Sequence, residues 1–427
     1  MASQSSSLPA FTQKTILQHK PFRTIWLAQF VSIFGDFLAL FGVISLITFK
    51  LHGTAVQVTA VTIAYVLPLA VISPVAGVFV DHWNVRRVMI ASDLVRAFLI
   101  TLLVFVTDIG QICAIFALLS AVSSFFAPAQ SVTLRTVVPM QGLLAANAMI
   151  TQAFYIVRLF SPFAAGALIA VMGERICFWL DTISFLFSAA MISTLVILRP
   201  ARANAEKTVQ ALTQDFVAGN KFIFTHAGLA FVFLAMAVAM FVLSSFSPLI
   251  SIYIRDSLGA GPFLFGVISS MVGIGLIAGS QVLTRVTGKT EASEKVPPRT
   301  NVVLGGLFAL GIGAALLGGF QNVIMAALST FTMGFAISFV LVPAQTMSQQ
   351  ETPPEMVGRV SSTFMSLIAV AQVLGLALSG YLANALGIRP LFMASAGFLF
   401  VVAGAGYWLM RGRTAADLQS RGQVAGG

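Results

Sequence analysis

The sequence is poor in charged residues: Asp, Glu, Lys and Arg make up 9% of its 427 residues, whereas hydrophobic residues make up 58%. Soluble domains usually carry about a quarter charged residues. The shortage of charge therefore excludes an ordinary soluble globular protein. The apolar residues lie in runs of about 20 residues or more, a length that crosses the hydrocarbon core of a bilayer. We therefore expect a chain embedded in a lipid bilayer.

The sequence is also poor in cysteine. Its two cysteines, Cys113 and Cys177, both lie within apolar runs, so no pair in exposed loops predicts a disulfide framework or a zinc site. No phosphate-binding P-loop, HExxH motif or Cys/His cluster occurs,. We therefore expect no cofactor, no metal ion, no primary ATP-driven engine and no enzymatic activity.

Apolar runs bounded by charges and turn residues predict twelve membrane-spanning helices. The predicted spans cover 22–49, 56–80, 88–107, 111–134, 146–171, 175–198, 228–250, 263–284, 301–318, 322–343, 360–384 and 390–410. Because the number is even, both termini lie on the same side. The predicted fold class is all-α integral membrane, with twelve transmembrane helices in two six-helix bundles.

The net charge of +10 is explained by where Lys and Arg lie relative to the spans. If the termini are cytoplasmic, eighteen of the 24 basic residues lie on the cytoplasmic side and two, Arg96 and Arg158, lie within helices. The other side holds four: Lys50, Arg175, Arg255 and Arg389. This asymmetry follows the positive-inside rule. It predicts a multi-pass protein of the cell (inner) membrane with both termini in the cytoplasm, and we expect a monomer with no nucleic-acid partner.

An internal repeat divides the chain. The motif Pro128–Gln130 closes the fourth span and the same motif, Pro343–Gln345, closes the tenth, at an offset of 215 residues that Pro139 and Pro354 also keep. Two copies of a six-helix unit in the same orientation explain this parallel repeat. The predicted divisions are an N-terminal cytoplasmic tail (1–21), a first bundle (22–198), a cytoplasmic linker (199–227), a second bundle (228–410) and a C-terminal cytoplasmic tail (411–427).

The loop between the second and third spans has an acid at the end of one helix and two arginines at the start of the next. The residues that define it are Gly77, Asp81, Asn84, Arg86 and Arg87. Asn84 suits the left-handed conformation that such a tight turn needs. The stretch resembles the loop 2–3 signature of the major facilitator superfamily, with His82 in place of a basic residue and Asn84 in place of the usual glycine.

The resemblance covers nearly the whole chain. Residues 91–97, 126–129, 181–185 and 354–360 are similar to the subgroup of drug:proton antiporters that holds macrolide-efflux proteins and the enterobactin exporter. Pro162 and Gly166 lie in a stretch similar to the Gly-Pro-x-x-Gly-Gly antiporter motif, with two glycines replaced.

The resemblance implies two bundles that rock about a central cavity. It also implies that Asp81 docks near Gly358 and Arg359, at the start of the eleventh span, and helps to close a cytoplasmic gate. A carboxylate is favourable at a helix N-terminus on dipole grounds. The alternative is a solvated loop acid with no gating role.

Charges within the spans are costly and mark ion or substrate routes. Asp36 lies 13 residues after Arg23, about 20 Å along a helix, and is expected to carry a proton; the alternative is a permanently paired structural acid. Arg158, midway along the fifth span, is the expected counter-charge of Asp36. Contact with a substrate, or snorkelling to the interface, are the alternatives for Arg158.

Two further acids lie in spans of the first half. Asp93 and Arg96 are three residues apart on one helix face, which predicts an intrahelical ion pair, with a direct role in transport as the alternative. Asp181 is a second candidate proton site, or an acid used in helix packing. The spans of the second half contain no acid but are rich in Met and Phe, which suit an apolar or amphipathic ligand.

Together these features predict a secondary active transporter. The expected activity is proton-coupled export of amphipathic or hydrophobic small molecules, such as drugs, macrolides or siderophore-like compounds, by alternating access. The expected partners are the small-molecule substrate, protons and the lipid bilayer. Two alternatives stay open: a lysophospholipid mover of the same fold, and a non-transporting sensor or scaffold.

Overall fold

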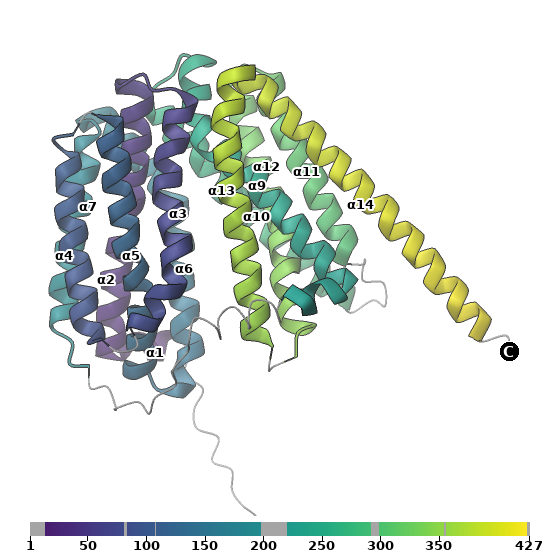
Figure 1. Cartoon of the computed structure of the whole chain (residues 1–427), viewed down its shortest axis with the longest axis horizontal. Helices are drawn as coiled ribbons and strands as arrows, with labels where there is room; N and C mark the ends of the chain where they lie inside the picture. Colours follow the sequence, from purple (N-terminus) through teal and green to yellow (C-terminus); the bar gives the residue numbers. More distant parts are fainter. Residues whose placement is uncertain are drawn as a thin grey trace, which may run out of the picture. The chain divides into compact units, whose positions relative to one another are not determined.

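The computed structural model describes residues 13–80, 83–106, 108–197, 220–291, 299–353 and 356–424. In these ranges the chain is helical, without a β-strand. After a short helix, α1 (Gln13–Gln18), the first half of the described chain forms six long helices (Figure 1). They are α2 (Lys20–Ser45), α3 (Ala55–Val80), α4 (Val85–Leu103), α5 (Ile109–Val137), α6 (Leu143–Met172) and α7 (Arg175–Ser193).

The second half repeats this pattern with six more long helices. They are α9 (Ala227–Asp256), α10 (Pro262–Glu291), α11 (Arg299–Gly319), α12 (Val323–Gln350), α13 (Val357–Leu386) and α14 (Ile388–Val424). Pro128 lies inside α5 and Pro343 lies inside α12. Each is the fourth long helix of its half, as the sequence repeat predicts.

The twelve long helices correspond one to one with the twelve predicted spans, so the predicted all-α membrane fold is confirmed. Eleven of the helices in the described part are long and apolar enough to cross a membrane. The other is α4, which carries Arg86, Arg87, Asp93 and Arg96 within 19 residues. Composition alone therefore does not identify α4 as a membrane span. Its charges are tolerated because Asp93 and Arg96 pair inside the protein.

Some predicted boundaries fall near, but not at, the ends of helices. Helix α14 continues to Val424, beyond the predicted end of the last span at 410. The predicted linker 199–227 lies largely outside the described residues, which resume at residue 220. The predicted tails, linker and bundle limits therefore stay predictions.

The chain divides into two compact units. The first, the N-terminal unit, comprises Met1–Ile47 and Ala64–Lys207; the second, the C-terminal unit, comprises Thr48–Ile63 and Thr208–Gly427. A short segment from the first half of the chain thus packs with the second half. Helix α3 contributes residues to both units.

The N-terminal unit is built around α2 and α4. Helix α2 packs against α6 and α7, and α4 packs against α5 and α7. One apolar cluster joins Leu38 of α2 to Ala165 and Ile169 of α6 and to Cys177 of α7. Small and medium side chains at such contacts let membrane helices approach closely, and van der Waals contact then stabilises the bundle.

The C-terminal unit is held by close helix contacts. Helix α10 packs on α12, α11 packs on α12 and α14, and α9 packs on α13. A Cβ atom added to Gly275 would lie 2.0 Å from the carbonyl oxygen of Phe331, and one added to Gly334 would lie 1.9 Å from that of Val272. Helices α10 and α12 therefore touch backbone to backbone, which only glycine permits.

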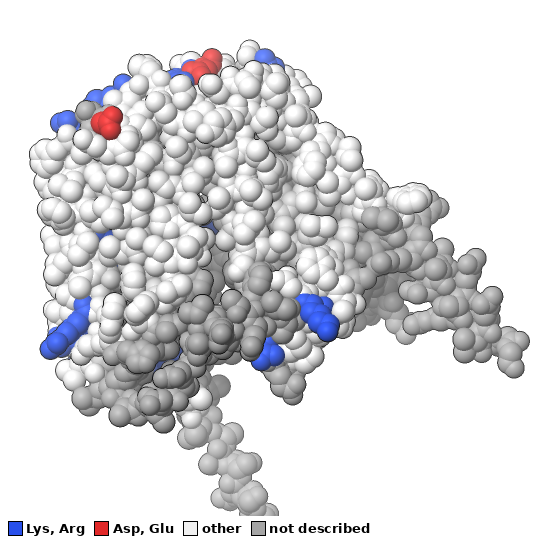
Figure 2. Space-filling model, in the orientation of Figure 1, with Lys and Arg blue, Asp and Glu red and all other residues white. Residues whose placement is uncertain are grey.

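The surface agrees with a chain embedded in lipid. On the face drawn in Figure 2, the charged side chains of the described residues lie mainly towards the ends of the helices, and the band between them is almost entirely uncharged. Large apolar side chains such as Phe98, Ile183 and Val401 are exposed in the middle of helices. Hydrocarbon tails are a suitable environment for these side chains.

Candidate functional site

A buried ion pair lies in the middle of α4. The guanidinium of Arg96 donates a hydrogen bond from Nη2 to the Asp93 carboxylate one turn earlier. The side chain of Asp93 is 0% exposed and that of Arg96 is 4% exposed. The ion pair predicted from the three-residue spacing is therefore present, and it is fully inside the N-terminal unit.

The same guanidinium also faces an acid on a second helix. Nη1 of Arg96 lies 3.9 Å from Oδ2 of Asp36 on α2, and the Asp36 side chain is 21% exposed. Asp36 is therefore the more accessible of the two carboxyl groups that share Arg96. The longer distance makes its interaction weaker than the hydrogen-bonded pair with Asp93.

Aromatic rings hold the guanidinium in place. The Arg96 Cζ atom lies 4.6 Å from the centre of the Phe126 ring on α5 and 4.3 Å from that of Phe185 on α7. Both distances are within the range of cation–π attraction, which is strongest where water is excluded. Four helices thus meet at Arg96: α2, α4, α5 and α7.

A third carboxyl group lies beside this pair. Asp181 on α7 is buried, and its Oδ1 atom accepts a hydrogen bond of 3.0 Å from Ser184 Oγ. A Cβ atom added to Gly35 would lie 2.4 Å from Asp181 Oδ1, so Asp181 touches the backbone of α2 at the residue before Asp36. Among the described residues, the other carboxyl oxygen of Asp181 has no hydrogen-bond partner.

These four side chains form what we call the acidic cluster: Asp36, Asp93, Arg96 and Asp181. The cluster contains three carboxyl groups but one guanidinium, which faces Asp36 and Asp93, so only one negative charge can be neutralised by a positive one. Uncompensated charge is costly in a low-dielectric interior. The chemistry open to such a cluster is the uptake and release of protons.

Arg158 lies elsewhere in the N-terminal unit. Its side chain is exposed on the surface of α6, and in the described part of the chain it makes no ion pair with a carboxylate. Asp36 pairs with Arg96 instead, so the predicted pairing of Asp36 with Arg158 is wrong. The sequence gives the depth of each charge along its helix, but the rotation of the helices decides which charges meet.

The loop 2–3 motif is described only in part, because Asp81 and His82 lie outside the described residues. Asn84 has φ −71° and its side chain accepts a hydrogen bond of 3.1 Å from the backbone N–H of Arg87. The predicted left-handed conformation of Asn84 is therefore wrong. Asparagine is a strong helix N-cap residue, and Asn84 caps α4.

The arginines of this motif play different parts. Arg86 donates a hydrogen bond from Nη2 to the carbonyl oxygen of Ser193 at the end of α7. This contact places a positive charge at a helix C-terminus, where the dipole favours it. Arg87 is exposed, and Gly77 on α3 has no atom within 4 Å of the Cβ it lacks. Close packing within the described residues therefore does not explain the glycine at position 77.

The expected gate partners lie at the start of α13. Gly358 and Arg359 are in its first turn, and the Arg359 side chain is exposed. Since Asp81 is not among the described residues, the docking of Asp81 on this turn stays a prediction. Pro162 and Gly166 of the antiporter-like motif are both buried inside α6.

Several residues of the site have no distinct signal in the sequence. The phenylalanines at 126 and 185 are two of 37 in the chain, and Ser184 is an ordinary helical serine. Gly35 does carry a usable signal, because a glycine directly before an intramembrane acid indicates a close helix approach at that acid.

The chain is similar to known proteins along nearly its whole length. Residues 12–425 match the family of transmembrane secretion effectors. The chain is 27% identical over 394 residues to an uncharacterized MFS-type transporter of Bacillus subtilis (strain 168), YfiS, covering 90% of this chain and 91% of that protein. It is 23% identical over 397 residues to macrolide efflux protein A of Streptococcus pyogenes, covering 90% and 94%.

Solved structures show the same fold at lower identity. The crystal structure of a mutant of the nucleoside transporter NupG superposes with a TM-score of 0.73 at 13% identity, covering 91% of this chain and 99% of that one. At this identity the match shows the fold alone. The family match spans nearly the whole sequence, and the chain therefore belongs to the transmembrane secretion effector family of the major facilitator superfamily, as a multi-pass membrane transporter.

Proposed function

We propose that the chain is a secondary active transporter that exports amphipathic or hydrophobic small molecules by alternating access, in exchange for protons bound at the acidic cluster. The similarity to a macrolide efflux protein supports the export of drug-like molecules. The distribution of Lys and Arg supports an inner-membrane protein with both termini in the cytoplasm. The protein acts as a monomer and needs no metal or cofactor.

The observation that carries the proposal is the excess of carboxyl groups over cations in the acidic cluster. Arg96 and Asp93 are hydrogen-bonded and buried, so they form the fixed part of the cluster. Asp36 is partly exposed and lies farther from the guanidinium. Asp36 is therefore the group that exchanges its proton with water, and the Arg96–Asp93 pair stays intact while it does so.

Asp181 acts as a second proton site within the cluster. It lies against Gly35 and has no cation in hydrogen-bond contact among the described residues. A buried carboxyl group without a cation is more stable when it holds a proton. Loss of a proton from Asp36 and loss from Asp181 oppose each other, because each adds negative charge beside the other group.

Arg158 contacts the substrate in this proposal. Arg158 is exposed midway along α6, one helical turn after Phe154 and Tyr155,. The ring centre of Phe154 lies 5.9 Å from that of Tyr155 and 5.9 Å from that of Phe37. An unpaired cation inside a membrane span marks a substrate or ion route. The cation suits an acidic or strongly electron-rich substrate group, and the rings suit its apolar part.

The cytoplasmic gate is closed by loop 2–3. Asp81 docks on the first turn of α13 near Gly358 and Arg359, where the N-terminal dipole of the helix favours a carboxylate. The contact from Arg86 to the end of α7 supports this role, because it ties the start of α4 to the N-terminal unit. The loop then moves together with that unit.

The test uses inside-out vesicles with an imposed pH gradient and a pH-sensitive dye. Ethidium, erythromycin, enterobactin and lysophosphatidylglycerol are added in turn. We expect proton release with at least one compound, and a loss of at least about tenfold in the Asp36→Asn variant. Asp108→Asn is the matched control, because Asp108 is an exposed N-cap of α5 and asparagine caps a helix equally well.

The outcomes separate the candidate functions. Proton release that is equal in Asp36→Asn and wild-type vesicles would overturn the role of Asp36. Movement of lysophosphatidylglycerol that does not respond to the pH gradient would favour the lipid mover. Binding of a compound without movement of any compound in well-folded protein would favour the sensor or scaffold.

A further inference from the structure

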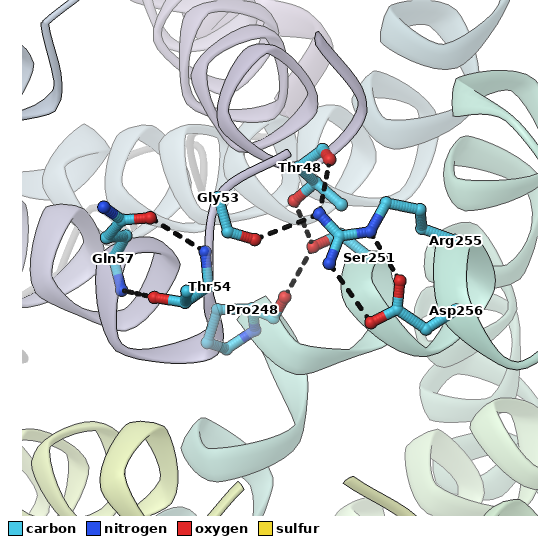
Figure 3. Close-up of polar contacts among 8 residues, drawn as sticks. All are labelled: Thr48, Gly53, Thr54, Gln57, Pro248, Ser251, Arg255 and Asp256. Atoms are coloured by element: carbon cyan, nitrogen blue, oxygen red, sulfur yellow. Dashed lines mark hydrogen bonds and ion pairs between the residues drawn. The ribbon is translucent and has the colours of Figure 1, made fainter. Parts of the chain in front are cut away.

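A turn from the first half of the chain is bound by the C-terminal unit. Arg255, in the last turn of α9, donates from Nη1 to the carbonyl oxygen of Thr48 at 2.7 Å and to that of Gly53 at 3.0 Å (Figure 3). The other side of the guanidinium pairs with Asp256, through Nε at 2.6 Å and Nη2 at 3.1 Å. The guanidinium is thus fixed by its neighbour and aimed at the turn.

A second polar contact lies one helical turn earlier. The hydroxyl oxygens of Thr48 and Ser251 are 2.8 Å apart and buried. Because Ser251 donates its own proton to the carbonyl oxygen of Pro248 at 2.7 Å, the proton between the two hydroxyls comes from Thr48. Figure 3 shows this chain of contacts continuing from the Arg255 contacts.

The turn also makes apolar contacts in the C-terminal unit. The rings of Phe49 and Phe265 have centres 6.3 Å apart. Thr59 is buried, and a Cβ atom added to Gly380 on α13 would lie 2.1 Å from its Oγ1 atom. Three helices, α9, α10 and α13, therefore hold the segment Thr48–Ile63.

The turn has its own fixed shape. Residues Leu46–Lys50 form a π-helical turn at the end of α2, a geometry frequent at functional sites. His52 adopts φ +48°, which costs energy for a residue with a side chain. Thr54 and Gln57 then form a reciprocal capping box at the start of α3,. Arg255 thus binds a preformed surface of backbone carbonyl groups.

The turn is covalently joined to α3, which passes from one unit to the other. Helix α3 is continuous, but residues up to Ile63 belong to the C-terminal unit and residues from Ala64 belong to the N-terminal unit. Any movement between the units must therefore bend α3 near these residues or release the turn. Bending is the easier of the two, because Pro68 has no N–H to donate to the carbonyl oxygen of Ala64 and so weakens α3 at this boundary,.

We propose that Arg255 and Ser251 form a latch that fixes the α2–α3 turn to the C-terminal unit, at the predicted outer end of the helices, so that α3 bends beside Pro68 when the two units move. This inference goes beyond the proposed function and does not depend on protons or on the substrate. The cation recognises backbone carbonyl oxygens, so the latch depends on the shape of the turn and on no partner side-chain charge.

The test measures how fast a cysteine at the buried position 59 reacts. Thr59→Cys is made with Cys113 and Cys177 replaced by serine, in folded full-length protein in right-side-out and inside-out vesicles. A membrane-impermeant maleimide labels it. We expect Arg255→Gln to raise the labelling rate by about tenfold, which corresponds to about 1.4 kcal/mol of latch stability, from the predicted outer side only.

Arg389→Gln is the matched control. Arg389 also donates to two backbone carbonyl oxygens, those of Gly318 and Gly319, each at 3.0 Å. Those contacts join α14 to α11, and not to the α2–α3 turn. Arg389→Gln should therefore leave labelling at position 59 unchanged.

A second variant keeps the latch testable if Arg255→Gln does not fold. Thr48→Val together with Ser251→Ala removes the hydroxyl contact without changing charge, and we expect labelling to rise about threefold. The latch is overturned if Arg255→Gln labels no faster than Arg389→Gln, or if the hydroxyl double variant labels at the wild-type rate. Equal acceleration by both arginine variants would also overturn it, because general loosening of the unit would then explain the result.

Discussion

The two units of this transporter are built from equal numbers of long helices but have different interiors. The N-terminal unit holds Asp36, Asp93, Arg96 and Asp181 between its helices, and all but the partly exposed Asp36 are buried. In the described part of the C-terminal unit, charged side chains lie near the ends of the long helices, as Arg255 and Arg389 do. Charge in the middle of the membrane is therefore a property of one unit.

The C-terminal unit obtains its polar contacts in another way. Thr330 Oγ1 of α12 lies 3.0 Å from the carbonyl oxygen of Ile268 on α10, and Ser245 Oγ of α9 lies 3.0 Å from that of Gly375 on α13. Each hydroxyl shares its proton between this carbonyl and one in its own helix. Glycines bring the same helix pairs into backbone contact. A stable six-helix unit can thus form without buried charge, so the charges of the N-terminal unit are not needed for helix packing in general.

The largest loss of stability is expected on substitution of Arg96, the cation of the acidic cluster. Arg96→Met leaves three carboxyl groups without a cation, and removing one partner of a buried ion pair usually costs about 3–5 kcal/mol. We expect a loss of that size in the free energy of unfolding, measured by SDS titration in mixed micelles. Arg87→Met, an exposed arginine on the same helix, should change it by less than about 0.5 kcal/mol. A small loss in Arg96→Met would mean that all three carboxyl groups can hold protons without Arg96.

The equivalent weak point of the C-terminal unit is a glycine. Gly275→Ala places a methyl group against the Phe331 carbonyl oxygen, and such overpacking costs about 1–3 kcal/mol. Gly305→Ala is the control, because no described residue lies within 4 Å of its missing Cβ; it should stabilise α11 by about 0.5–1 kcal/mol. If both variants behaved alike in the same titration, helix propensity and not close packing would explain the glycines.

The smallest effect is expected on removal of the hydroxyl contact between α12 and α10. Thr330→Val removes the hydrogen bond to Ile268 while keeping the shape of the side chain, and should cost about 1 kcal/mol. Thr332→Val on the same helix is the control, because its hydroxyl donates to the carbonyl oxygen of Leu328 within its own helix. A loss in Thr332→Val as large as that in Thr330→Val would show that the bond between helices contributes nothing.

Most of the fold could be predicted because membrane insertion leaves a strong one-dimensional signal. Runs of apolar residues give the number and approximate ends of the helices, and the PAQ motifs at 128–130 and 343–345 give the repeat. Helix α4 is recognisable in the sequence despite its charges, since its neighbours and loop motif define its limits. The segment Thr48–Ile63 could not be assigned to its unit, because nothing local indicates which helices it contacts.

The candidate site was only partly predictable, for a related reason. Asp93 and Arg96 lie on one helix, and the 3.6-residue period fixes their relation. The partner of Asp36 lies on another helix, and nothing along the chain distinguishes Arg96 from Arg158 as that partner. The prediction for Asn84 was wrong because asparagine serves both left-handed turns and helix N-caps, and the choice depends on the backbone of the turn.

By itself, the sequence determined the number of helices, the depth of each charge within them and the difference in charge between the two halves. These follow from composition and from distances along the chain, which a helix converts into height at a fixed rise per residue. Only the tertiary structure decided that Asp36 and Asp181 meet at Gly35, that two rings enclose Arg96, and that Arg255 binds the α2–α3 turn. Such contacts depend on how each helix is rotated about its axis, and packing against neighbouring helices sets that rotation.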